Sequence, residues 1–336
     1  MIIVRAPLRI SFVGGGTDLP DFYHQHTGRV ISATINKFVY LVINPCYIED
    51  KLIIKYKITE IVDNPNDLKH SRFKAAFNYF DFKNKGLEIG TFADIPARTG
   101  LGSSSSFSVA LMKSLSLLQG KSMGQEEVAQ AACHLEIDLL KEPIGKQDQY
   151  AAAYGGFNIF QFNEDDTVDV EPVLIGYDKK NELEDHMLLF YTGITRDASS
   201  VLVDQLTKIN DNFDIYCKMA DSVDNFKDKL VSGDIKGMAN MLHEGWLSKK
   251  SLGDNVSNDL IDRLYQTCIS AGAWGGKILG AGGGGCMFLL ASPDNHQNIR
   301  EKMYQIAKEN SLENFKEIPI KFTQSGADVL FNSKFN

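Results

Sequence analysis

The sequence predicts an α+β protein of two domains, and three observations support that class. A chain of 336 residues is about twice as long as a usual domain. Its composition, 43% hydrophobic and 23% charged, is that of a folded globular protein. Segments typical of strands and of helices are mixed, without the regular alternation of a doubly wound parallel sheet. We place the boundary in the charged segment Asp178–Asp185, which divides the chain into domains 1–180 and 181–336.

In the first domain, runs of β-branched and aromatic residues predict strands. The expected strands are Ile2–Arg5, Leu8–Val13, two within Arg29–Asn44 with a turn near Asn36 between them, Lys51–Ile58, Leu87–Ile95, Gly156–Phe162 and Thr167–Ile175. Pro20 is expected to start a short helix. Apolar residues at helical spacing predict three longer helices. These run from after Asn66 to about Phe80, from Ser103–Ser106 to Gly120, and from Gln125 to Leu140.

The second domain is expected to open with a strand and then to be mainly helical, with three or four helices before about Gly272. Its other segments alternate between short apolar runs and glycine-rich or charged stretches. In order they are strand Met187–Tyr191, strand Trp274–Leu279, a tetraglycine loop at 282–285, strand Cys286–Ala291, a helix near Asn295–Glu309 and a strand near Phe315–Phe322.

Charge and cysteine content exclude several kinds of partner and site. A net charge of −8 argues against a nucleic-acid partner, which needs clustered Lys and Arg. Five cysteines without a CxxC pair indicate reduced thiols rather than disulfides or a zinc site. Arg5 and Arg9 interrupt the first apolar stretch, and no apolar run reaches the roughly 18 residues of a spanning helix. We expect a cytoplasmic monomer or homodimer without a membrane partner.

Glycines are concentrated in three loops, and the middle one is the most informative. There Gly100-Leu101-Gly102 leads into Ser103–Ser106 at the start of an amphipathic helix. Free amides and the positive end of the helix dipole favour an anion at such a position, and the hydroxyls could hold phosphate oxygens or Mg²⁺. An ordinary serine N-cap is the alternative. No GxxxxGK[ST] sequence occurs, so the loop is not a Walker A loop.

The other two glycine loops do not predict a nicotinamide site. Gly280–Gly285 matches GxGxxG, but a short apolar run bounded by Ser292-Pro293 follows it. That run is typical of a strand, whereas a dinucleotide site requires a helix there. Gly14–Gly16 fails the same pattern because position 19 is leucine.

Two acids stand between these loops. Glu136 lies at the margin of the apolar stripe of its helix, so its carboxylate needs a partner. A structural salt bridge, a base and a metal ion all remain open. Asp148 follows the turn at Gly145 and precedes the small residues Ala151–Ala153. It fits either a helix cap or a carboxylate presented into a cleft.

Together these motifs resemble those of the GHMP kinases over nearly the whole chain. The three matching stretches are Ala6-Pro7-Leu8-Arg9 followed by Gly14-Gly15-Gly16-Thr17-Asp18, then Pro96-Ala97-Arg98-Thr99-Gly100-Leu101-Gly102-Ser103-Ser104, then Lys277-Ile278-Leu279-Gly280-Ala281-Gly282-Gly283-Gly284-Gly285-Cys286. The second stretch is the most specific, although Arg98 stands where the family usually has glycine. The resemblance implies an N-terminal domain similar to domain 2 of ribosomal protein S5 and a ferredoxin-like C-terminal domain.

The resemblance also implies ATP and Mg²⁺ as cofactors. The expected ATP-binding residues are Arg98, Gly100, Leu101, Gly102, Ser103, Ser104, Ser105 and Ser106. Ser104 and Glu136 match the Mg²⁺ ligands, Asp148 the acid that takes the proton of the attacking hydroxyl, and Arg9 the arginine that orients this acid. The expected substrate-binding residues are Gly15, Gly16, Thr17, Asp18, Arg196, Gly282 and Gly283. Lys146 is a further candidate partner for Asp148.

Within the family, the GGGTDLPDF stretch resembles the sugar 1-kinases that act on heptose and fucose. The implied reaction is ATP-dependent phosphorylation of the anomeric hydroxyl of D-glycero-α-D-manno-heptose 7-phosphate, giving the 1,7-bisphosphate in GDP-heptose biosynthesis. A fucokinase-like or other sugar 1-kinase and a non-catalytic sugar and ATP sensor are the alternatives. A 7-phosphate requires cations. The candidates are Arg72, Lys74, Arg196, Lys249 and Lys250, with Arg196 preferred because it follows a strand end.

Overall fold

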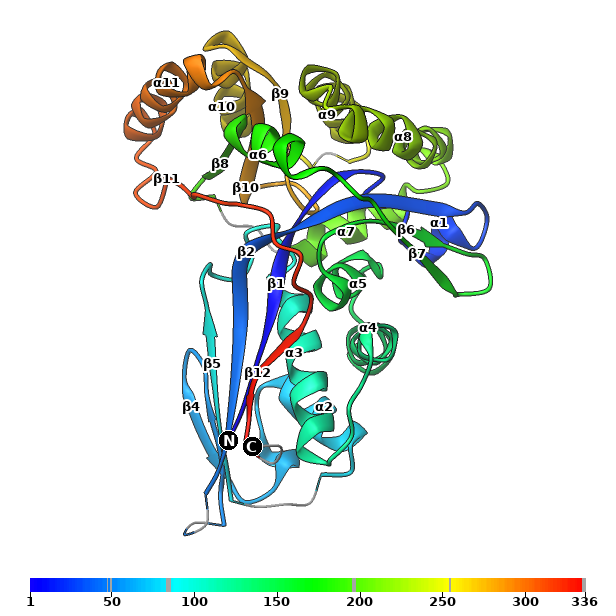
Figure 1. Cartoon of the computed structure of the whole chain (residues 1–336), viewed down its shortest axis with the longest axis vertical. Helices are drawn as coiled ribbons and strands as arrows, with labels where there is room; N and C mark the ends of the chain where they lie inside the picture. The colour runs from blue at the N-terminus through cyan, green and yellow to red at the C-terminus, as the bar shows by residue number, and fades with distance from the viewer. Residues whose placement is uncertain (47, 49, 83–85, 195–197, 254, 334–336) are drawn as a thin grey trace.

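The structure, a computed structural model, describes residues 1–333 except 47, 49, 83–85, 195–197 and 254. It contains two sheets (Figure 1). The larger sheet forms the elongated lower part, with helices on one face, and the smaller one lies in the upper part among the later helices. This mixture of sheets and helices confirms the predicted α+β class. The division at residue 180 stays a prediction.

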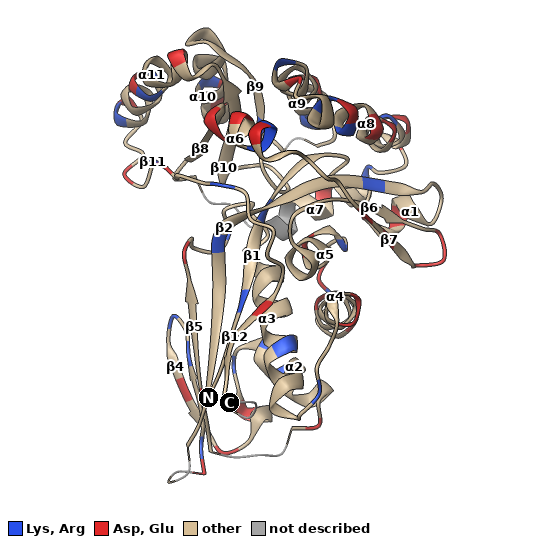
Figure 2. Ribbon diagram, in the orientation of Figure 1, with Lys and Arg blue, Asp and Glu red and all other residues tan. Residues whose placement is uncertain are grey.

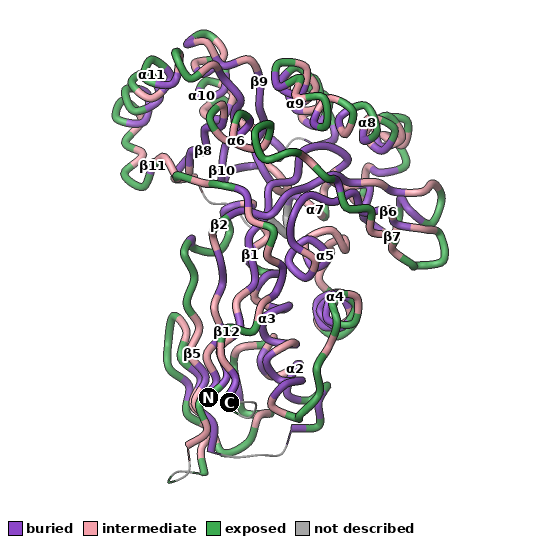
Figure 3. Tube along the Cα trace, in the orientation of Figure 1, coloured by how far each residue is buried: buried purple, intermediate pink, exposed green. Residues whose placement is uncertain are grey.

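The larger sheet is built on two long antiparallel strands, β1 (Ile2–Val13) and β2 (Gly28–Pro45). Its path runs β12-β1-β2-β5-β3-β4, and β6 and β7 join the other end of β2. The remaining strands are β3 (Leu52–Lys55), β4 (Thr59–Val62), β5 (Leu87–Ala93), β6 (Phe157–Phe162), β7 (Val168–Pro172) and β12 (Asp328–Asn332). β1 is buried along most of its length (Figure 3), because helices cover one face and the upper part of the molecule covers its end.

The predicted turn near Asn36 is wrong, since β2 is one continuous strand. Pro7 pairs with Phe38 while Leu8 pairs with Ile35, so two extra residues of β2 form a bulge at this point. The bulge bends the strand without ending it. Proline cannot donate a ladder hydrogen bond, which fits its place at this irregularity.

Five helices accompany this sheet: α1 (Pro20–Tyr23), α2 (Ser71–Tyr79), α3 (Ser103–Leu118), α4 (Gln125–Cys133) and α5 (Gln147–Tyr154). The sequence predicts α2 and α3 closely. It does not predict α5, whose Ala151–Ala153 run gave no helical periodicity, although all three alanines are buried. The predicted helix to Leu140 is only partly right, because α4 ends at Cys133 and a π-helical turn, His134–Leu139, follows.

The π-helical turn changes which residues face the core. A π-turn holds about one residue more than an α-turn, so it rotates the residues that follow. Glu136, expected at the margin of the apolar stripe, is fully buried, whereas Leu139, four residues after the buried Leu135, is 43% exposed. The acid has therefore taken an interior position. Turns of this kind occur frequently at functional sites.

The later part of the chain contains the four-stranded sheet, in the order β11-β8-β10-β9 with every pair antiparallel. Its elements are α6 (Tyr177–Asp185), β8 (Met187–Tyr191), α7 (Ala198–Thr207), α8 (Phe213–Ser232), α9 (Ile235–Lys250), α10 (Asp259–Ser270), β9 (Ala273–Ile278), β10 (Cys286–Ala291), α11 (His296–Glu309) and β11 (Lys316–Glu317). The strand expected near Phe315–Phe322 is thus only two residues long. The chain then returns to the larger sheet, where β12 pairs with β1.

The surface and the cysteines are consistent with the composition. Acidic and basic residues are interspersed along α8, α9 and α11 (Figure 2). The five cysteines, all in the described part of the chain, are free thiols. None of the helices formed by the described residues combines the length and apolarity that crossing a bilayer requires.

Candidate active site

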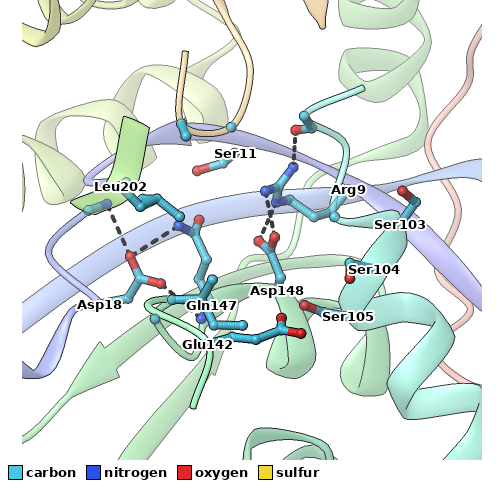
Figure 4. A pocket seen from close by; sticks show the side chains of 18 of the residues that line it. Arg9, Ser11, Asp18, Ser103, Ser104, Ser105, Glu142, Gln147, Asp148 and Leu202 are labelled. Carbon is cyan, nitrogen blue, oxygen red and sulfur yellow. Dashed lines mark hydrogen bonds and ion pairs between the residues drawn. The ribbon is translucent and has the colours of Figure 1, made fainter. Parts of the chain in front are cut away.

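A cavity of about 430 Å³ lies where the end of β1, the start of α3, the start of α5 and the end of α9 meet (Figure 4). Most of the predicted site residues line it. They are Arg9, Gly15, Gly16, Asp18, Arg98, Gly100, Gly102, Ser103, Ser104, Ser105 and Asp148. The three predicted motifs, far apart in the sequence, therefore meet at one place.

The phosphate turn, residues 98–106, presents its serines to this cavity. Gly102 takes a left-handed φ of 76° immediately before α3, so the first amides of the helix are free at the cavity wall. Ser104 lies in the first turn. Ser106 instead faces the protein, since its hydroxyl donates to the carbonyls of Pro7 and Gly102. This turn has the free donors and the helix dipole that an anion needs.

Two neighbours hold the phosphate turn in place. On one side Arg9 N donates to Leu101 O (3.0 Å), and on the other Cys286 N donates to Thr99 O (2.9 Å). Gly280 lies so close that a Cβ there would be 2.8 Å from the Cα of Gly100. This packing explains why both loops are glycine-rich.

Arg98 has a left-handed φ of 67°, the conformation that glycine adopts most readily. The family usually has glycine at this position. Arg98 therefore preserves the backbone path of the loop at a conformational strain of about 1–3 kcal/mol. Arg98 also lines the cavity.

Arg9 and Asp148 form a bidentate ion pair. Arg9 Nε donates to Asp148 Oδ1 (2.7 Å) and Nη2 to Oδ2 (2.8 Å), while Nη1 donates to Gly100 O (2.6 Å). The side chain of Arg9 is 4% exposed and that of Asp148 is 25% exposed. The buried arginine therefore holds the carboxylate in place while the carboxylate stays open to the cavity. Asp148 is in the first turn of α5, where the helix dipole favours a negative charge. Lys146 is not its partner, because it binds Asp166.

Asp18 lies on the other side of Gln147 from Asp148 (Figure 4). It accepts hydrogen bonds from Gly16 N (3.0 Å), Gln147 N (3.2 Å) and Gln147 Nε2 (3.1 Å), and so caps α5 from a separate loop. Burial, and then the charge of Asp148, raise the pKa of Asp18. The two acids and the end of α5 thus form one connected unit.

Glu136 lies beneath the cavity rather than in its lining. Its carboxylate accepts hydrogen bonds from Ser108 Oγ (2.9 Å), Gln149 Nε2 (2.5 Å) and Arg72 (3.2 Å). Ser108 also donates to Ser104 O, and Gln149 adjoins Asp148, so Glu136 is tied to both sides of the site. Ser104 and Glu136, the expected Mg²⁺ ligands, and Asp148, the expected proton acceptor, therefore belong to one connected group of residues.

Sequence reasoning missed Glu142. Its carboxylate accepts from Arg72 Nη2 (2.6 Å), and both residues line the cavity. In Figure 4 Glu142 points toward Ser104 and Ser105. Burial raises the pKa of Glu142, and the charge of Arg72 opposes that rise. In the sequence, the only signal for Glu142 was its place as an acid in the short break between two helices.

Two lysines also line the cavity. Lys249, one of the cation candidates, comes from the last turn of α9, and Lys277, which was missed, from β9. Burial, together with the charge of Arg9, lowers the pKa of Lys249 to about 8. Burial lowers the pKa of Lys277 as well. A lysine inside an otherwise apolar strand was the signal that could have identified it.

Several predicted residues lie elsewhere. Thr17 is buried and hydrogen-bonds Gly14 O and Arg29 O. Gly283 N donates to Val256 O, and Gly282 packs on the same valine. Leu101 is a core residue, and Arg196 lies outside the described residues. Of the other cation candidates, Lys250 pairs with Asp262.

Comparisons with known proteins agree with these motifs. The model of the GHMP kinases N terminal domain matches residues 71–156, and that of the GHMP kinases C terminal domain matches 226–309. The D-glycero-alpha-D-manno-heptose 7-phosphate kinase of Campylobacter jejuni is 33% identical over 314 residues, 89% of this chain and 91% of that protein. The bifunctional fucokinase/GDP-fucose pyrophosphorylase of Arabidopsis thaliana is 26% identical over 91% of this chain but only 31% of its own length.

Among solved structures, the D-glycero-D-manno-heptose 1-phosphate kinase of Bacteroides thetaiotaomicron is similar over 99% of both chains, with a TM-score of 0.79 and 25% identity. The match to the Campylobacter kinase covers nearly the full length of both proteins, and both family models fall on the parts of the chain that build the cavity. The chain therefore belongs to the GHMP kinase family.

Proposed function

We propose that this ATP-dependent kinase transfers the γ-phosphoryl group of ATP to the anomeric hydroxyl of D-glycero-α-D-manno-heptose 7-phosphate. The observation that carries the proposal is the Arg9–Asp148 pair, which faces the serines of the phosphate turn across one cavity. The similarity to the heptose 7-phosphate kinase of Campylobacter jejuni supports the choice of sugar. The product is the 1,7-bisphosphate, an intermediate of GDP-heptose biosynthesis.

In the proposed mechanism, the phosphate turn binds the ATP phosphates through its free amides and serine hydroxyls. Asp148 accepts the proton of the anomeric hydroxyl as that oxygen forms its bond to the γ-phosphorus. The bond from the γ-phosphorus to the bridging oxygen breaks, and ADP leaves. Arg9 fixes the carboxylate and offers positive charge beside the phosphoryl group, where a loose transition state carries its negative charge.

The donor set fits Mg²⁺. Ser104, Glu136 and Glu142 offer hydroxyl and carboxylate oxygens, the ligands that this ion prefers. The guanidinium of Arg72 now bonds both glutamates, which supports a preference of this pair for positive charge. When bound, Mg²⁺ neutralises charge on the β- and γ-phosphates. We infer that Ser104 and Glu136 hold it, with Arg72 withdrawing toward Glu142.

Replacing Glu136 with glutamine should raise the Mg²⁺ concentration needed for half-maximal activity by about 10- to 100-fold. The amide keeps the shape of the side chain but loses the charge that would bind the ion. A Mg²⁺ titration at saturating ATP and sugar measures the effect. Asp138→Asn, in the same π-helical turn but exposed and paired with His134, is the control. An unchanged titration for the Glu136 variant would remove this residue from the metal site.

An assay of ADP release across several sugars tests the proposed function. We expect turnover with heptose 7-phosphate to exceed that with free heptose, fucose and galactose. A preference for free fucose would support a fucokinase-like enzyme instead. Binding of sugar and ATP without ADP release at saturation would support a sensor. Arg9 and Asp148 argue against the sensor, because their pairing supports Asp148 as a base beside the phosphate turn.

A further inference from the structure

Two buried lysines of the cavity have no carboxylate partner in the described part of the chain. Lys249 and Lys277 are each 7% exposed. Among the described residues, no Asp or Glu oxygen lies within 4.0 Å of either ammonium group, whereas Arg9 on the same wall is paired with Asp148. A buried charge without an ionic partner is costly. Such a pair therefore indicates that an anion completes this wall.

The hydrogen bonds of the two lysines are incomplete as well. An ammonium group has three donors. Lys277 donates to Ser11 O (3.1 Å) and Phe12 O (2.9 Å), and Lys249 donates to Gly280 O. With the described residues as partners, two donors of Lys249 and one of Lys277 are thus left over. Beside them, the hydroxyl of Ser11 is buried, lines the same cavity and has no hydrogen-bond partner in the described part of the structure.

Ser11 and Lys277 lie further along β1 than Arg9, whereas Lys249 reaches Gly280 O, next to Gly100 of the phosphate turn. Ser11 is two residues beyond Arg9 on the same face of β1, which places it roughly 7 Å further along the strand. The two lysines also line a second cavity of about 280 Å³, bounded by the end of β1, α8 and α9. A ligand that starts at Asp148 and passes along β1 would reach Ser11 and Lys277 with its far end, with Lys249 beside it where the two cavities adjoin.

We infer that Lys249, Lys277 and Ser11 form a subsite for a phosphate ester at the end of the sugar remote from its reacting hydroxyl. The inference rests on the proposed function, because it takes the sugar to lie between Asp148 and this wall. The subsite would select a sugar phosphate over the free sugar. Arg196, the preferred cation of the sequence, lies outside the described residues, whereas the two lysines line the cavity.

The alternative is that the lysines only hold the backbone of the β1 end and the loop after β9. A test must therefore separate phosphate recognition from local structure. Lys249 suits this purpose because its ammonium group makes one hydrogen bond to the residues that the structure describes. Replacing it with methionine keeps much of the length and apolar volume of the side chain while removing the charge. Ser11→Ala removes one oxygen without disturbing the backbone bonds to Lys277.

For Lys249→Met we expect KM for heptose 7-phosphate to rise about 10- to 100-fold, with little change in KM for unphosphorylated heptose. Ser11→Ala should shift KM in the same direction by a smaller factor. Lys250→Met, the neighbour that pairs with Asp262, is the matched control and should leave both values unchanged. Equal effects on the two sugars, or none on either, would overturn the subsite.

The pH dependence gives a second readout. Lys249 is faced by Arg9 and Lys277, which disfavour its charge, and by Asp18 and Asp148, which favour it. Because the pKa of Lys249 is about 8, the ammonium loses its proton as the pH rises above this value. KM for the phosphorylated sugar should therefore increase from about pH 8 upward, and KM for the free sugar should not. Lys249→Arg, whose charge persists, should abolish this increase.

Binding of inorganic phosphate distinguishes failure of the subsite from failure of the proposed function. The measurement is made with Mg²⁺ and a non-hydrolysable ATP analogue filling the phosphate turn. If the enzyme phosphorylates neither form of heptose but Lys249→Met loses phosphate binding, the proposed function is wrong and the subsite stands. Equal phosphate binding by the enzyme and the variant overturns the subsite, whatever sugar is the substrate.

Discussion

Asp148→Asn is expected to lower kcat by about 10²- to 10⁴-fold. The amide preserves the size of the side chain and one of the two bonds to Arg9, but it cannot accept the proton of the anomeric hydroxyl. ATP binding should change little, because the phosphate turn is on α3 and not on α5. Steady-state kinetics at saturating ATP and sugar measure the loss.

Asp21→Asn, an exposed acid in the first turn of α1, is the control and should retain full activity. A fall in kcat smaller than about tenfold, or roughly 1.4 kcal/mol, would show that Asp148 is not the base. Positioning of the sugar beside ATP would then account for the rate.

Arg9→Met is expected to reduce kcat by about 10²- to 10³-fold, the usual cost of losing a donor that stabilises developing charge. The variant removes both bonds to Asp148 and the bond to Gly100 O, so the base loses its orientation and the phosphate turn one of its supports. Arg9→Lys should restore little, because an ammonium group cannot form the bidentate pair. Kinetics and a thermal unfolding curve are measured together.

Arg5→Met, in the same strand and paired with the half-buried Asp328, is the matched control. The double variant with Asp148→Asn provides the sharper measurement. Two residues that act as one unit give a combined loss well below the product of the single losses. Fully multiplicative losses would contradict the proposed joint action of the pair.

The sequence predicted much of the fold because most elements have clear periodicity. Helix α3 and strands β8 and β10 lie where apolar spacing places them. The errors occur where a local pattern is overridden by tertiary contacts. Asn36 is typical of a turn, yet pairing with β1 carries β2 through it as a bulge. β12 has no strong pattern of its own, and its pairing with β1 depends on the rest of the sheet.

The residues of the candidate site were predictable where they belong to a sequence motif and are of a type suited to the proposed reaction. Arg9, Ser104 and Asp148 are of this kind, and they meet at the cavity. Glu142 and Lys277 were not predictable, because an acid or a lysine has many surface roles and only the folded chain shows burial. The interior position of Glu136 likewise depends on a π-helical turn that no spacing rule anticipates.

Because strand β1 holds Leu101 on one side and the start of strand β10 holds Thr99 on the other, the turn at residues 98–106 is shared between the two sheets. A movement of either sheet relative to the other would strain the two backbone hydrogen bonds that hold this turn. Substitutions that move the start of β10 would therefore also move Thr99, and with it the turn at 98–106 that lines the cavity.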